Sequence, residues 1–207
     1  MKKIVLIRHA KTQGNLEKRY IGRTDDPLCG DGVAQAKALF ESGKLPRPDA
    51  LICSPYLRCT QTVEILYPGM AYEINHDLRE CDFGIFEGKT HAELLDNDEY
   101  SSWLSTNCMR DIPGGESVTA FKQRCRTAFA EDAGNKPDDA AVAFIIHGGC
   151  IMAILEHFSR PQKEFQEYYV NNCEVVICSF DGAFLKITGV RDIKVPAMGA
   201  PASPPVV

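Results

Sequence analysis

Short apolar runs alternate along the chain with segments that have helical periodicity. Lys3 to Ile7 and Ala141 to Ile146 are apolar runs of strand length that end abruptly at polar residues, as buried parallel strands do. Ala50 to Cys53 predicts another short strand, and Ala71 to Ile74 predicts one more. The pattern therefore places at least four short strands in the first three quarters of the chain.

Between these strands, apolar residues recur at the spacing of amphipathic helices. Asp31 to Ser42 has this spacing, and Ser54-Pro55 predicts an N-cap with proline at the first position of a helix that runs to about Leu66. A Pro-Gly-Gly break precedes a long predicted helix from Glu116 to about 130, and Ile151 to Phe158 predicts the last one.

The end of the chain changes pattern. Glu174 to Phe180 and Ala183 to Val190 predict two strands that Asp181-Gly182 joins as a hairpin. Strands alternating with helices, followed by a hairpin, predict an α/β fold, a three-layer α/β/α sandwich with a mostly parallel central sheet and an antiparallel edge strand. Residues 195–207 hold four of the twelve prolines and no periodicity, so we expect one domain over 1–194 and a Pro-rich tail without regular structure.

Composition excludes several classes of protein. The 207 residues are 44% hydrophobic and carry a net charge of −5, which supports a packed core and argues against nucleic-acid binding. No apolar run approaches the roughly 18–20 residues that span a bilayer, and the apolar N-terminal run breaks at Arg8-His9, so neither a membrane partner nor secretion is expected. Nine cysteines without a Cys-x-x-Cys pair indicate reduced thiols, a cytoplasmic location and no zinc site.

Arginine or histidine side chains follow three of the predicted strands. The first ends in Arg8-His9, the second leads to Arg58, and the Ala141 strand ends in His147-Gly148. Because the carboxyl ends of parallel strands meet at one edge of a sheet, two histidines and two arginines should lie together there. Arginine pairs and helix N-termini hold dianions well, so the sequence predicts an anion site that contains a nucleophile or an acid–base group.

The segment "LIRHAKTQGN" (6–15) resembles the opening signature of the histidine phosphatase superfamily, the phosphoglycerate mutase-like fold. Five further blocks resemble the superfamily in the same order: "GRTDDPLCGDG" (22–32), "CSPYLRCTQT" (53–62), "LRECDFGIFEG" (78–88), "PGGES" (113–117) and "HGG" (147–149). One block alone could arise by chance, but six in order are specific.

The resemblance implies a role for each catalytic candidate. His9 would attack phosphorus and form a phosphohistidine, with the proton on its other ring nitrogen held by a main-chain acceptor. Arg8, Arg58 and His147 would surround the phosphoryl oxygens. Glu80 would protonate the leaving alkoxide and then deprotonate water.

The same resemblance implies that Asn15, Gly22 and Gly148 bind the phosphate. We expect catalysis to need no metal or other cofactor, because Arg8, Arg58 and the two histidines supply the charge that a cation would otherwise bring. Ala10 departs from the usual glycine after the histidine, which adds a methyl group beside the nucleophile. No departure removes a catalytic group.

Rival interpretations differ in how much support they have. A cysteine phosphatase fails because neither Cys53 nor Cys150 has an arginine at the required spacing. A cofactor-dependent phosphoglycerate mutase-type transfer remains an alternative, as does a non-catalytic module that binds a phosphorylated ligand. Mutases of the superfamily generally carry a longer insertion than the short predicted cap at 89–112, which favours hydrolysis of a small phosphorylated metabolite.

A short cap of this kind is typical of the small phosphatases, among them α-ribazole-5′-phosphate phosphatase. The cap contains Trp103, which either stacks on a flat ring of the substrate or packs in the core. The sequence leaves the natural substrate and the oligomeric state open.

Overall fold

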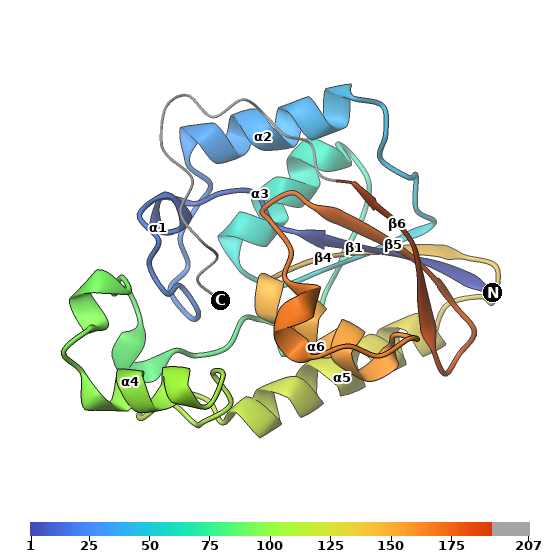
Figure 1. The fold of residues 1–207 in the computed structure, drawn as a ribbon. Helices are drawn as coiled ribbons and strands as arrows, with labels where there is room; N and C mark the ends of the chain where they lie inside the picture. The colour runs from blue at the N-terminus through green and yellow to red at the C-terminus, as the bar shows by residue number, and fades with distance from the viewer. Residues whose placement is uncertain (192–207) are drawn as a thin grey trace.

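A six-stranded mixed sheet forms the centre of the structure (Figure 1). The computed structural model describes residues 1–191, so the predicted tail at 195–207 lies outside the described residues. In the order β3-β2-β4-β1-β5-β6, neighbours among the first four strands run parallel, β5 is antiparallel to β1, and β6 is antiparallel to β5. The strands are β1 (Lys2–Arg8), β2 (Ala50–Cys53), β3 (Glu73–Ile74), β4 (Ala141–Ile146), β5 (Val175–Phe180) and β6 (Leu185–Arg191).

Helices cover both faces of the sheet. Side chains of α2 and α3 pack on one face, and side chains of α5 and α6 pack on the other, which confirms the predicted three-layer α/β/α sandwich (Figure 1). The helices are α1 (Gln13–Leu16), α2 (Gly30–Glu41), α3 (Leu57–Leu66), α4 (Asp98–Ser105), α5 (Val118–Gly134) and α6 (Gly148–Phe158). None of the helices in residues 1–191 is long and apolar enough to cross a membrane.

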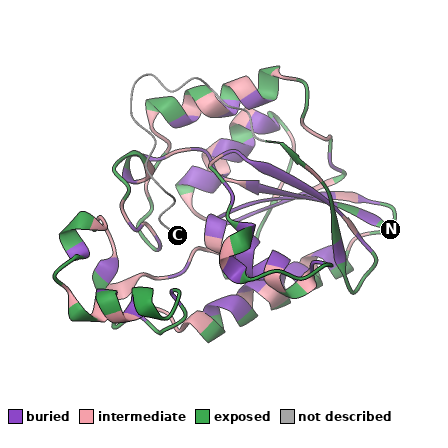
Figure 2. Ribbon diagram, viewed as in Figure 1, coloured by how far each residue is buried: buried purple, intermediate pink, exposed green. Residues whose placement is uncertain are grey.

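The continuous apolar character of β1 follows from its position in the middle of the sheet. Ile4 and Leu6 belong to the core beneath α5 and α6, whereas Val5 and Ile7 belong to the core beneath α2 and α3. All four side chains are fully buried, and Figure 2 shows the central strands buried along most of their length. A strand with two buried faces has no polar alternation, which explains the pattern in the sequence.

Three predicted helix starts were wrong by two or three residues. Ser54 does not cap α3, which begins at Leu57, because the Ser54 hydroxyl makes a hydrogen bond with the His147 ring instead. Helix α5 begins at Val118, two residues after Glu116. Helix α6 begins at Gly148 rather than Ile151 because His147, directly after β4, is its N-cap.

The predicted cap, residues 89–112, contributes to a small core of its own beside the sheet. Trp103 is 4% exposed and packs edge-on against Tyr20, with ring centroids 5.7 Å apart. The cluster comprises Tyr20, Phe86, Leu94, Tyr100, Trp103, Cys108 and Ile112. Tyr20 lies outside the cap, so these aromatic contacts attach the cap to the loop that follows α1.

Candidate active site

The sheet register brings two histidines together at the carboxyl ends of the central strands. Arg8 pairs with Ile146 across β1 and β4, and the next amide, that of His9, donates to the Ile146 carbonyl oxygen at 2.9 Å. His9 and His147 therefore lie side by side, with ring centroids 5.3 Å apart in an edge-to-face arrangement.

His9 is held as a neutral imidazole. Its Nδ1 lies 2.7 Å from the Ala10 carbonyl oxygen, which can only accept, so Nδ1 carries the proton and Nε2 keeps its lone pair. The ring is 4% exposed, and burial, followed by the charges of Arg58 and Arg8, lowers its pKa well below the ordinary value. A neutral ring with a free Nε2 is the form that can attack phosphorus.

His147 is fixed as the opposite tautomer. The Arg58 Nε–H donates to His147 Nδ1 at 3.2 Å, so Nε2 carries the proton and lies 2.7 Å from the Ser54 hydroxyl oxygen. The ring is fully buried, and burial together with Arg58 lowers its pKa well below the ordinary value. Both ring nitrogens therefore have defined hydrogen-bond roles.

Arg58 is a buried guanidinium that main-chain oxygens hold in place. It is 1% exposed and donates to the carbonyl oxygens of Gly22 at 2.8 Å and Thr24 at 2.7 Å. A Cβ on Gly22 would lie 1.9 Å from the Cys81 carbonyl oxygen, so only glycine permits this approach. The structure thus places Gly22 as the support of Arg58.

Arg8, Asn15 and Gly148 lie in one pocket. Arg8 donates to the Val170 carbonyl oxygen at 2.8 Å, whereas its Nε is buried without a hydrogen-bond partner among the described residues. A Cβ on Gly148 would lie 3.4 Å from the Arg8 guanidinium carbon, so the N-terminus of α6 is close to this guanidinium. The Asn15 side-chain oxygen accepts from the Asn172 side-chain amide at 3.2 Å.

Glu80 occupies the wall of the same pocket. Its two carboxyl oxygens accept from the main-chain amides of Cys81 at 3.0 Å and Gly149 at 3.1 Å. A Cβ on Gly149 would lie 2.5 Å from the nearer carboxyl oxygen, so the second glycine of "HGG" makes room for Glu80. Burial raises the pKa of Glu80 above the ordinary value, against the effect of these hydrogen bonds, and favours the proton-carrying form.

Several residues that support the site were not among the predicted ones. The Thr62 hydroxyl accepts from the Ala10 amide at 3.0 Å and donates to the Arg58 carbonyl oxygen at 2.6 Å. Ser54 and Thr62 both fall inside a block that resembles the superfamily, so that block contained a signal for them. Asn172, whose side chain donates to the His9 carbonyl oxygen at 3.0 Å, lies after the last block and gave no signal.

The Glu87 carboxylate is bound to the loop that contains Gly22 and Thr24. It accepts from the amides of Gly22 at 2.9 Å and Thr24 at 3.0 Å, and from the Thr24 hydroxyl at 2.7 Å. Glu87 therefore orders the loop whose carbonyl oxygens hold Arg58.

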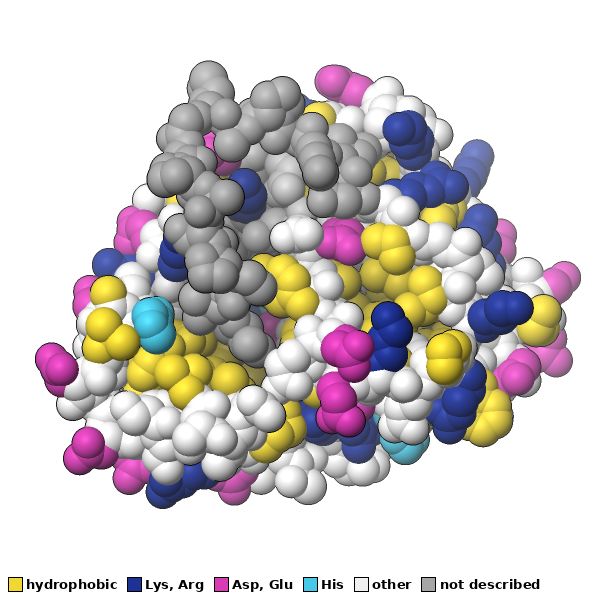
Figure 3. All heavy atoms as spheres, viewed as in Figure 1, with side chains coloured by type: hydrophobic (Ala, Val, Ile, Leu, Met, Phe, Trp, Pro, Cys, Tyr) yellow, Lys and Arg dark blue, Asp and Glu magenta, His cyan; other side chains and the backbone are white. Residues whose placement is uncertain are grey.

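The pocket has a volume of about 470 Å³ and two kinds of wall. Arg8, Lys11, Asn15 and Glu80 provide a polar side, and Phe83, Trp103, Ile112 and Phe121 are among the residues of an apolar side. Figure 3 shows hydrophobic side chains gathered on the face between α1 and α4. Across residues 1–191, no group of three or more His, Cys, Asp and Glu side chains is arranged to hold a metal ion.

A model of a known protein family spans most of the chain. The model of the histidine phosphatase superfamily (branch 1) matches residues 4–193. The chain belongs to the histidine phosphatase superfamily. Since the superfamily consists of phosphatases and mutases, the chain is an enzyme of this group.

The similar proteins bear the names of mutases and of phosphatases. The chain is 31% identical over 184 residues to the probable phosphoglycerate mutase GpmB of Enterobacter sp. (strain 638), over 84% of this chain and 83% of that protein. A phosphoglycerate mutase structure from Thermus thermophilus has a TM-score of 0.73 at 30% identity, covering 93% of this chain and 99% of that one. An α-ribazole phosphatase from Shigella flexneri has a TM-score of 0.77 at 23% identity, covering 97% and 100%, and shares the fold.

We expect His9 to stay neutral at pH 6.5, about where an unperturbed histidine is half protonated. The pKa of His9 is lower in the folded state than in the unfolded state, so protonation of His9 favours unfolding. The contribution of His9 to the free energy of unfolding is therefore present above the unfolded-state pKa and is lost as the pH falls through the folded-state pKa. Two-bond ¹H–¹⁵N NMR spectra should show His9 as the Nδ1–H tautomer at this pH, with the signal assigned by its loss in His9→Gln. An imidazolium pattern for His9 at pH 6.5 would contradict the geometry.

Proposed function

We propose that the chain is a phosphomonoesterase that hydrolyses a small phosphorylated metabolite through a phosphohistidine at His9. The observation that carries the proposal is the neutral His9 ring, whose pKa the charges of Arg58 and Arg8 help to lower, together with Glu80, a buried carboxyl group that the same two arginines influence. In the first step Nε2 forms a bond to phosphorus while the ester P–O bond breaks. In the second step water attacks phosphorus, the P–N bond breaks, and inorganic phosphate leaves.

Arg8 and Arg58 would stabilise the charge on the phosphoryl oxygens. His147 would join them by exchanging the Ser54 hydroxyl for a phosphoryl oxygen as the acceptor of its Nε2–H, because its Nδ1 already accepts from Arg58. The buried Nε–H of Arg8 has no acceptor among the described residues, and a phosphoryl oxygen would supply one. Arg58 has five N–H groups, of which three donate to His147 and two carbonyl oxygens, so two remain for the substrate. Preorganised donors of this kind typically contribute about 3–4 kcal/mol each to the transition state.

Glu80 would give its proton to the leaving alkoxide and recover one from the attacking water. Burial raises its pKa and so favours the protonated acid that the first step needs. Asp82 and Glu87 are less suitable donors. Asp82 pairs with Arg23 at 3.3 Å, and Glu87 accepts several main-chain amides.

The pocket suits a substrate larger than phosphoglycerate. Its volume of about 470 Å³ is in the range of about 300–1,000 Å³ typical of small-molecule sites, and its apolar wall suits a leaving group with a flat ring. α-Ribazole-5′-phosphate is such a substrate. Mutase-type transfer to a second substrate hydroxyl is the alternative, since the Enterobacter relative is a probable phosphoglycerate mutase.

A panel of metabolite phosphates tests the proposal. We expect inorganic phosphate release from phosphomonoesters with aromatic or heteroaromatic leaving groups, α-ribazole-5′-phosphate among them, at a higher kcat/KM than from 3-phosphoglycerate. Phosphate release and isomerisation of 3-phosphoglycerate are measured in parallel. Isomerisation faster than every hydrolysis would identify a mutase, and no turnover of any phosphate, nitrophenyl phosphate included, would identify a binding module.

The role of Glu80 is tested by Glu80→Gln. An alkyl phosphate leaves as a basic alkoxide and needs a proton, whereas nitrophenolate leaves unaided. Loss of a general acid should therefore slow phosphoenzyme formation from alkyl phosphates by about 10²–10⁴-fold and affect nitrophenyl phosphate far less. The rate is measured in a single turnover, because Glu80 would also act in the second step.

Two glycine variants provide matched controls for this experiment. Gly149→Ala places a Cβ 2.5 Å from the Glu80 carboxyl group and should produce the same difference between the two substrates. Gly134→Ala, at the end of α5, where the new Cβ would meet no other segment of residues 1–191 within 4 Å, should change neither rate. An equal loss with both substrates in Glu80→Gln would assign the proton donor to another group.

A further inference from the structure

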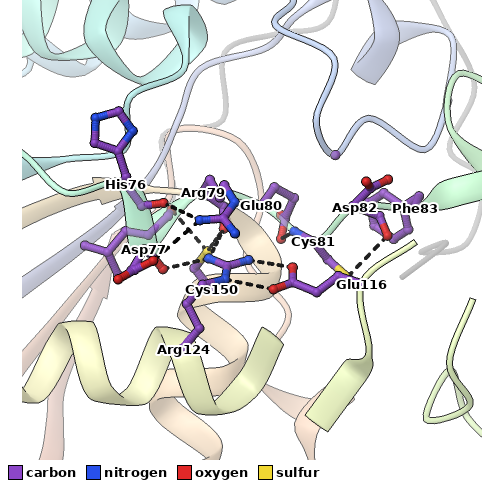
Figure 4. A network of polar contacts seen from close by, with 12 residues as sticks. His76, Asp77, Arg79, Glu80, Cys81, Asp82, Phe83, Glu116, Arg124 and Cys150 are labelled. Atoms are coloured by element: carbon purple, nitrogen blue, oxygen red, sulfur yellow. Dashed lines mark hydrogen bonds and ion pairs between the residues drawn. The ribbon is translucent and has the colours of Figure 1, made fainter. Parts of the chain in front are cut away.

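The loop that carries Glu80 is tied to helix α5 by a buried arginine. Figure 4 shows Arg124 reaching from α5 towards the loop, where it meets Glu116 and the main chain before Glu80. Its Nε–H and Nη2–H donate to the two carboxyl oxygens of Glu116 at 2.9 and 2.6 Å. Its Nη1 donates to the carbonyl oxygens of Asp77 at 2.7 Å and Arg79 at 2.9 Å. We call this pair, Arg124 and Glu116, the clamp.

The clamp fixes the peptide group between Arg79 and Glu80. The Arg79 carbonyl belongs to the peptide group that bears the Glu80 amide, and it accepts from Arg124 at 2.9 Å and from the Cys150 thiol at 3.2 Å. A rotation of this peptide would break both bonds, and it would turn the Cα–Cβ direction of Glu80. The side chain of Arg124 is 10% exposed, so water is a poor substitute for these contacts.

The clamp also holds the loop after Glu80. The Glu116 main-chain amide donates to the Asp82 carbonyl oxygen at 3.0 Å. A Cβ on Gly115 would lie 2.4 Å from the same oxygen, so the glycine permits the two segments to touch. Residues on both sides of Glu80 are therefore bound to the one pair of residues, and "PGGES" supplies more than the start of a helix.

The effect of the clamp on Glu80 is geometric. The Arg124 and Glu116 charges oppose each other in a two-point ion pair, which limits the charge that either presents to Glu80. The charges that lower the pKa of Glu80 come from Arg58 and Arg8 instead. Removing the clamp should displace the carboxyl group while leaving His9 and the arginines around it in place.

We propose that Arg124 and Glu116 are positioning residues that hold Glu80 where its proton reaches the leaving oxygen. This inference deepens the proposed function and rests on the acid role of Glu80 given there. A displacement of about 1 Å can cost about 10²-fold in rate, so the clamp accounts for a large part of the contribution of Glu80. Neither residue is among those that line the pocket.

The test compares Arg124→Gln with wild type in single-turnover phosphoenzyme formation. We expect an alkyl phosphate to react about 10- to 100-fold more slowly and nitrophenyl phosphate to change by less than about threefold. Arg124→Lys, which keeps the charge and part of the side-chain length, should recover part of the alkyl rate. A general defect of folding would instead lower both rates together, so thermal unfolding is recorded for each variant.

Arg126→Gln is the matched control. Arg126 is also on α5 and is paired, with Glu156 at 2.7 Å, but none of its hydrogen bonds within residues 1–191 goes to the Glu80 loop, and both rates should stay unchanged. The inference would be overturned if folded Arg124→Gln or Arg124→Lys reacted more slowly by the same factor with both substrates. It would also be overturned if neither variant slowed the reaction of the alkyl phosphate. When Glu80→Gln separates the two substrates and the Arg124 variants do not, the inference alone fails. If Glu80→Gln does not separate them, the acid role itself fails.

Discussion

The exclusion of water from the carboxyl ends of β1 and β4 is the constraint on which the rest of the site depends. His9, Arg58 and His147 are all nearly or fully buried there, although each is a polar or charged side chain. Burial disfavours the charged form of a titratable group, and it does so in opposite directions for bases and acids. It lowers the pKa of the two histidines and raises that of Glu80, so one environment favours both a neutral nucleophile and a protonated acid.

A buried guanidinium needs acceptors, and loops far apart in the sequence supply them with main-chain oxygens. Arg58 donates hydrogen bonds to the carbonyl oxygens of Gly22 and Thr24. Arg8 donates to the carbonyl oxygen of Val170. Arg124 donates to the carbonyl oxygens of Asp77 and Arg79. Because carbonyl groups are neutral, they hold each arginine without cancelling the positive charge that an anion needs. Among the described residues, Arg124 is paired with a carboxylate, whereas Arg8 and Arg58 are not.

Much of this arrangement was predictable from the sequence, for identifiable reasons. The apolar runs at 3–7 and 141–146 marked strands buried on both faces, and polar side chains directly after them marked the edge where they meet. Helix starts were less predictable, because capping residues also serve the site, as Ser54 does with His147. Asn172 and Arg124 act through contacts between segments far apart in the sequence, and no local pattern marks such contacts.

The covalent step at His9 is the centre of the proposed chemistry. The direct measurement is rapid quenching of the enzyme during turnover of a ³²P-labelled substrate, followed by acid or alkali treatment and peptide mapping. We expect label on the peptide that contains His9, stable in alkali and lost in acid as a P–N bond is, and absent from His9→Ala. Label that survives acid, or label that persists in His9→Ala, would contradict a phosphohistidine at this residue.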